Sequence, residues 1–189
     1  MLGFATESPG SVYTIGTDTT DHRLALFLIQ TQMNRGSGRI VPLGNLSTKM
    51  KDALKTADAH LKANLKNLGI DQDLNAYDFT VQVINLNQAR EGAETAVAFF
   101  VSMVSAVLGK AVIERTVIVG EMSVQGMLLK VNALPERMQL AVESGAKRIL
   151  IPSENKRDLA DVPDAILTAT QWQFYDSPTK AAVLAMGLG

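Results

Sequence analysis

The sequence predicts a single domain of the α/β (α+β) class, with a mixed β-sheet flanked by helices. Strand and helix patterns alternate in its second half: strands at 116–119, 148–151 and 172–175, and helices at 135–145 and 178–186. This alternation favours a sheet that contains parallel strands. A chain of 189 residues can bury one sizeable core. No linker, repeat or low-complexity tract interrupts it, so we expect one domain over 1–189.

The first half supplies further strands. Apolar residues among turn-forming glycines predict strands within 11–43, with turns at Gly10, Gly16, Gly36 and Gly38. Apolar and polar residues alternate over 78–84, which predicts a half-buried strand. A polar loop at 85–93 then leads into an apolar helix from about 94 to 108, too short to span a bilayer.

The clearest helix covers 47–68. Its apolar side chains recur at steps of three and four and share one face: Met50, Leu54, Ala57, Leu61, Leu65 and Leu68. Ser47 or Thr48 can cap its start, and Gly69 suits a left-handed residue at its end. The lysines at 51, 55, 62 and 66 are interpreted as its solvated face rather than as a nucleic-acid patch.

Composition excludes several kinds of site. The net charge of −1 gives no electrostatic case for nucleic acid or membrane. The absence of cysteine excludes disulfides and thiolate chemistry, and His22 and His60 do not have zinc-ligand spacing. No phosphate-loop motif is present, so we expect no ATP, metal or other cofactor in this domain. No signal peptide is visible, which predicts a cytoplasmic protein, and the start resembles the interior of a domain cut from a longer chain.

Several motifs in a fixed order carry a family resemblance. They are Gly-Glu-Met-Ser-Val-Gln-Gly at 120–126, Leu-Pro-Glu-Arg-Met at 134–138 and Ile-Pro-Ser-Glu-Asn-Lys-Arg-Asp-Leu at 151–159. The most specific matches lie at 145–152 and 155–159. In this order and spacing the chain resembles the proteolytic domain of Lon-type ATP-dependent proteases over nearly its whole length. The resemblance implies the Lon proteolytic-domain fold.

The resemblance also implies a serine nucleophile and a lysine base, and neither residue is present. The stretch that matches the family's Asp-Gly-Pro-Ser-Ala-Gly reads Glu-Gly-Ala-Glu-Thr-Ala at 91–96, so Glu94 stands at the serine position. Arg137 stands at the lysine position, and Val119 replaces a family threonine. Arginine stays protonated and cannot act as the base. Glutamate is a poor nucleophile without a base or an activated electrophile. We therefore expect a domain without peptidase activity.

Glu94 and Arg137 have opposite charges at positions that face each other in the family. This predicts a charge-assisted bond between them and a structural role for the site. The alternative is that Glu94 only favours a helix N-terminus through the macrodipole, while Arg137 is solvated.

A displaced active site is a second possibility. Its candidate residues are Thr95 and Ser123 as nucleophiles and Lys130 as the base. Thr95 is turned about 100° from the lost serine along a helix, and Ser123 stands where the family often has threonine. Ser102 and Ser105 are interpreted as core hydroxyls bonded to backbone carbonyls.

A Lon-like domain without the catalytic pair is similar to the C-terminal part of the Lon-like protein of bacterial BREX phage-defence systems. That resemblance implies an upstream AAA+ ATPase that holds ATP and Mg²⁺, a homo-hexameric ring, and DNA bound through other parts of the chain. A DNA-repair ATPase with a non-proteolytic Lon-like domain is a related possibility. The competing functions are an ATP-dependent serine or threonine endopeptidase with a displaced nucleophile, and direct DNA binding by this domain.

Overall fold

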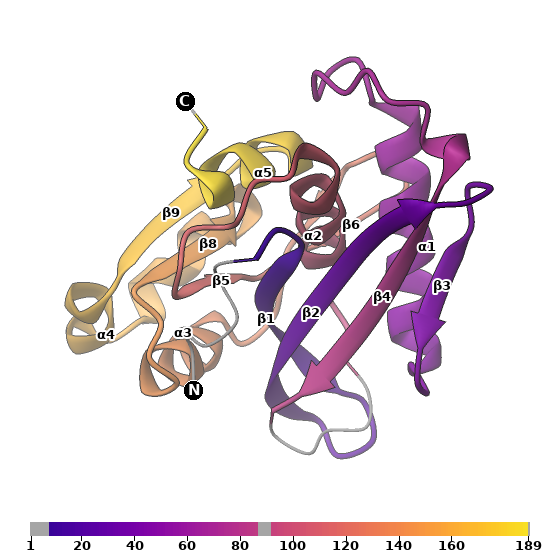
Figure 1. The fold of residues 1–189 in the computed structure, drawn as a ribbon. Coiled ribbons are helices and arrows are strands. Elements are labelled where there is room, and N and C mark those ends of the chain that lie inside the picture. Colours follow the sequence, from indigo (N-terminus) through magenta and orange to yellow (C-terminus); the bar gives the residue numbers. More distant parts are fainter. Residues whose placement is uncertain (1–7, 87–91, 189) are drawn as a thin grey trace.

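A seven-stranded mixed sheet forms the centre of the computed structural model, which describes residues 8–86 and 92–188 (Figure 1). Its strand order is β3-β4-β2-β1-β5-β8-β9. The strands are β1 (Ser11–Asp18), β2 (Arg23–Arg35), β3 (Ile40–Leu43), β4 (Tyr77–Asn85), β5 (Thr116–Ile118), β8 (Arg148–Pro152) and β9 (Gln171–Tyr175). Strand β2 is antiparallel to β1 and β4, and the other pairs are parallel. The predicted mixed sheet is confirmed.

Helices cover both faces of the sheet. On one face lie α1 (Thr48–Ala63), α2 (Ala96–Leu108) and α5 (Pro178–Met186), and on the other lie α3 (Leu134–Glu143) and α4 (Asp164–Ala169). Successive β1 side chains enter opposite cores, with Val12 on the α2 side and Tyr13 on the α3 side. This follows from the two-residue period of a strand. Both faces of β1 are therefore buried.

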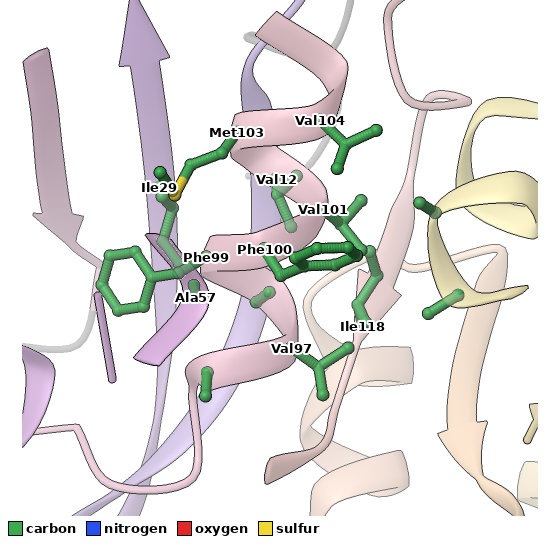
Figure 2. Packing of buried hydrophobic residues seen from close by; sticks show 14 of the residues in the cluster. Val12, Ile29, Ala57, Val97, Phe99, Phe100, Val101, Met103, Val104 and Ile118 are labelled. Carbon is green, nitrogen blue, oxygen red and sulfur yellow. The ribbon is translucent and has the colours of Figure 1, made fainter. Parts of the chain in front are cut away.

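The α2 helix is the centre of the larger core. Figure 2 shows Phe99, Phe100 and Met103 of this helix among side chains from the sheet and α1. Two α2 hydroxyls also fasten the start of β1. Ser102 Oγ donates to the Gly10 carbonyl over 2.6 Å, and Ser105 Oγ accepts from the Gly10 N–H over 2.9 Å and donates to the carbonyl of Lys110. The interpretation of both serines as core hydroxyls is confirmed.

Helix α1 ends earlier than the sequence predicts. It runs from Thr48 to Ala63 rather than to residue 68, with Ser47 Oγ accepting from the Met50 N–H as the cap. Asn64 leaves the helical conformation at φ −126°, and its Nδ2 donates to the His60 carbonyl over 2.8 Å. Gly69 is left-handed as expected, but it closes a separate turn after the helix.

Three further expectations need correction. Gly16 lies inside β1 rather than in a turn, and β8 continues one residue beyond the expected 148–151 to include Pro152. The apolar helix begins at Ala96 instead of 94, because Glu94 has a φ of +60° that no α-helix accepts. Part of the expected polar loop, 87–91, lies outside the described residues.

Several short elements have no counterpart in the sequence prediction. These are the ribbon of β6 (Glu121–Met122) and β7 (Leu128–Leu129), the 3₁₀ segments η1 (Leu74–Ala76) and η2 (Ser153–Asp161), and α4. Within residues 8–86 and 92–188, no helix has the length and apolar character needed to cross a bilayer.

Candidate functional site

The site lies at the carboxyl ends of the parallel strands β1 and β5, where α2 and α3 begin. Ala93 pairs with Thr17 at the end of β1: the Ala93 N–H donates to the Thr17 carbonyl over 2.9 Å. This bridge places Glu94, the next residue, beside the sheet. Arg137 lies in the first turns of α3, which packs on the opposite face of the sheet from α2. Segments far apart in sequence therefore meet at this edge.

The Arg137 side chain is completely buried and bonded from all its nitrogens. Nε donates to the Asn132 carbonyl over 2.7 Å, and Nη1 donates to the Ile15 carbonyl over 2.9 Å. Nη2 donates to Glu94 Oε2, Thr17 Oγ1 and Asn132 Oδ1 over 3.0, 3.1 and 2.8 Å. Because Nη2 carries two hydrogens, at least one of these three bonds is shared. A buried guanidinium needs such a set of acceptors to offset its desolvation.

Glu94 reaches Arg137 from a strained turn. Its φ of +60° is left-handed, a conformation that costs a side-chain-bearing residue about 1–2 kcal/mol. Gly16 of β1 permits this turn, because a Cβ on Gly16 would lie 2.7 Å from the Ala93 carbonyl oxygen. The Glu94 side chain is 24% exposed and that of Arg137 is 0% exposed. The predicted ion pair is confirmed, and the alternative of a solvated Arg137 is wrong.

A second carboxylate, Glu121, caps the start of α2. The helix gains no cap from the hydroxyl of its N-cap residue, Thr95, which donates to the Gly92 carbonyl instead. Glu121 accepts from the Met122 N–H over 3.0 Å and from the Ala96 N–H. Burial raises the pKa of the Glu121 carboxyl, the nearby charge of Glu94 adds to the rise, and the two N–H groups and Lys49 oppose it. The surroundings of Glu121 therefore disfavour its ionised form relative to a carboxyl in water.

The fold and the position of this site are consistent with the protein family that the sequence matches. The model of the Lon protease (S16) C-terminal proteolytic domain matches residues 6–187. The chain belongs to this family. It is 30% identical over 182 residues to a "Lon-like protease BrxL" of Escherichia coli O9:H4 (strain HS), and 28% identical over 181 residues to one of Bacillus cereus (strain H3081.97). A Lon protease of Azorhizobium caulinodans is 31% identical over 147 residues.

Coverage differs sharply between this chain and those relatives. The matches cover 95% of this chain for both BrxL proteins and 77% for the Azorhizobium protease. They cover only 26%, 27% and 17% of the relatives themselves. This Lon-type domain therefore spans about a quarter of the length of the BrxL proteins.

The three residues proposed for a displaced active site lie in three different places within the Lon-type domain. Thr95 is buried at the α2 N-terminus, whereas Ser123 Oγ accepts from the Met127 N–H in the loop between β6 and β7. Lys130 is exposed and forms an ion pair with Asp158 over 3.3 Å, at a hollow of about 420 Å³ beside the start of α3. In the part of the chain that the structure describes, no hydrogen bond or ion pair joins these three residues to one another.

Sequence reasoning missed three partners of Arg137: Thr17, Asn132 and the Ile15 carbonyl. Asn132 lies five residues before Arg137, so a bond across the start of α3 could have been considered. Thr17 and Ile15 come from β1, more than a hundred residues away, and only the fold brings them close. The cap by Glu121 was also missed, because nothing local links it to α2.

The chemistry of this arrangement favours a fixed cation. Arg137 faces one carboxylate and four neutral oxygens, and all five accept hydrogen bonds from its guanidinium. The Arg137 guanidinium itself cannot accept a proton from a nucleophile at neutral pH. The geometry suits a structural role in which Arg137 joins β1, the turn at Glu94 that precedes α2, and α3.

Proposed function

We propose that this Lon-type domain is non-proteolytic and acts as an assembly domain in a BREX-type phage-defence protein. The observation that carries the proposal is the complete burial of Arg137 against Glu94, at the positions where the family resemblance expects lysine and serine. A general base must exchange protons, whereas an arginine stays protonated, and this one donates hydrogen bonds to five acceptor oxygens.

Similarity to the two BrxL proteins supports the phage-defence part of the proposal, since both are similar to nearly the whole chain. Both relatives are named as proteases, and the proposal of a non-proteolytic domain differs from that name because of the chemistry of residues 94 and 137. The larger protein is proposed to be cytoplasmic, with an AAA+ ATPase that binds ATP and Mg²⁺, a homo-hexameric ring, and DNA contacts outside this domain.

Degradation of an unfolded protein substrate tests the catalytic part. The full-length protein is incubated with ATP and casein, beside an active Lon protease as the positive control. We expect no cleavage. Cleavage by the natural protein would overturn the proposal and direct mutagenesis to Thr95, Ser123 and Lys130.

A Glu94→Ser, Arg137→Lys double variant of the full-length protein restores the serine and lysine of the family's catalytic pair and tests whether the rest of that site is intact. Cleavage gained by this variant would indicate that the surrounding substrate site is intact. We expect no gain, because the oxygens of Ile15, Thr17 and Asn132 that now bind the guanidinium would stabilise a protonated lysine.

Light scattering on the full-length protein with ATP tests assembly. The proposal expects the mass of a hexamer, and expects a form lacking this domain to fall to smaller species. A hexamer that persists without the domain would place assembly in the ATPase and contradict the proposed role.

A further inference from the structure

A groove lies between the edge strand β3 and helix α1. Figure 1 shows these two elements beside each other. The groove has a volume of about 190 Å³ and is lined by Ile40, Pro42 and Leu54 with Lys51 and Lys55. Leu54 is buried and Ile40 is half-buried, so the floor is apolar. None of the residues that line this groove belongs to the Glu94–Arg137 site.

The outer edge of β3 offers only a short stretch of backbone. Phe79 N–H donates to the Arg39 carbonyl over 2.9 Å, so residues of odd number in β3 face β4 and Ile40 turns its N–H and C=O outward. Pro42 also faces outward but has no N–H. A strand added here could form hydrogen bonds to the N–H and C=O of Ile40 and to the carbonyl of Pro42, which limits a ligand to a short contact.

The rim of the groove is positively charged. Lys51 and Lys55 are exposed, lie one helical turn apart, and flank the apolar floor. By contrast, Lys62 on the same helix pairs with Asp58 over 3.1 Å, and Arg39 pairs with Asp78 over 3.3 Å. Among residues 8–86 and 92–188 no ion pair involves Lys51 or Lys55. The unpaired positive charge is local, because the chain as a whole carries −1.

We propose that the β3–α1 groove binds a short acidic peptide segment of a partner protein, with one apolar side chain on Ile40 and Leu54 and carboxylates on Lys51 and Lys55. The apolar floor distinguishes this ligand from a nucleic-acid backbone, which needs cations alone. Lysines on an edge strand often serve to prevent pairing with another strand. Lys51 and Lys55 lie on α1 instead, where they line the groove. The inference is independent of whether the domain is proteolytic.

Fluorescence anisotropy of short labelled peptides tests the groove on the full-length protein. The probe alternates glutamate with isoleucine, and two matched peptides replace glutamate by lysine or isoleucine by serine. We expect saturable binding of the first peptide that weakens at high salt, weaker binding of the serine peptide, and none of the lysine peptide.

Charge reversal locates the site without touching the core. Lys51→Glu with Lys55→Glu should weaken binding about tenfold, as expected for loss of two exposed ion pairs. Lys66→Glu with Lys110→Glu changes two exposed lysines elsewhere and should leave the affinity unchanged. Equal affinity in both variants, or equal binding of the lysine peptide, overturns the proposal.

Two further results, one from competition and one from self-association, would also overturn it. Displacement of the peptide by single-stranded DNA at comparable concentration would assign the lysines to phosphate binding. Self-association of the natural protein that disappears in the Lys51→Glu, Lys55→Glu variant would assign the groove to a second copy of the chain.

Discussion

Arg137 Nη2 lies 3.0 Å from Glu94 Oε2, and the two partners differ in how they depend on each other. Arg137 is fully buried and gains most of its bonds from neutral oxygens of β1 and of the segment before α3. The Glu94 side chain is partly exposed to solvent. The arginine is therefore the centre of this arrangement, and the carboxylate closes one side of it.

This asymmetry predicts that Arg137→Ala is among the most destabilising changes at the site. It leaves a cavity, removes the partner of Glu94 and leaves the Ile15 and Asn132 carbonyls without their donor. We expect a loss of about 3–5 kcal/mol in the free energy of unfolding, measured with urea. Glu136→Ala, an exposed neighbour on α3, is the matched control and should change it by less than about 0.5 kcal/mol. A loss no larger than that of the control would remove Arg137 from its central role.

The strained turn at Glu94 gives a second prediction. Glu94→Ala loses the ion pair but keeps a side-chain-bearing residue at φ +60°, whereas Glu94→Gly loses the ion pair and relieves the strain. The glycine variant should be more stable than the alanine variant by about 1 kcal/mol in urea unfolding. If the two variants unfold at the same urea concentration, the turn does not store strain.

The regular elements of this fold could be predicted because their signals are local. The period of apolar residues in α1, the alternation in β4 and the proline at the start of α5 each determine their own segment. Short elements such as the β6–β7 ribbon and α4 lack such a period, since two to six residues cannot establish one. Their form depends on tertiary contacts, including the bond between His60 Nδ1 and the Val124 carbonyl.

Some features of the candidate site could likewise be predicted from the sequence, and others could not. The pairing of Glu94 with Arg137 was predicted because the family resemblance places both positions and their charges are opposite. The left-handed turn at Glu94 could not be predicted, because no glycine or asparagine marks it and the bridge between Ala93 and Thr17 imposes it. The same holds for the cap by Glu121, whose target Ala96 lies 25 residues earlier in the sequence.

Glu121→Gln should stabilise the domain at neutral pH. Burial raises the pKa of this carboxyl above its ordinary value of 4.5, so the folded protein binds the proton more tightly than the unfolded chain. The favourable contribution of the protonated form is complete below pH 4.5 and is lost as the pH rises through the folded pKa. The neutral glutamine avoids that loss, and its amide oxygen can accept from the same N–H groups.

Urea unfolding of the natural protein and of Glu121→Gln across this pH range measures the effect. The two should converge below pH 4.5 and separate above it, with the variant the more stable. Glu114→Gln, at an exposed position outside the site, is the control and should follow the natural protein. A variant that is less stable at neutral pH would show that the charged cap outweighs the cost of burying it.

Gly16→Ala tests whether β1 sets the position of the Glu94 turn. Gly16 lies in an extended strand, so alanine causes no backbone strain there, but its Cβ would lie 2.7 Å from the Ala93 carbonyl oxygen and 3.1 Å from Thr95 Cγ2. The turn must move away from β1 and carry Glu94 from Arg137, at a cost of about 1–3 kcal/mol. Part of this cost should disappear when Glu94 is already alanine, because that variant has no ion pair to lose. A double-mutant cycle in urea unfolding measures the coupling, and strictly additive effects would mean that Gly16 acts on packing alone.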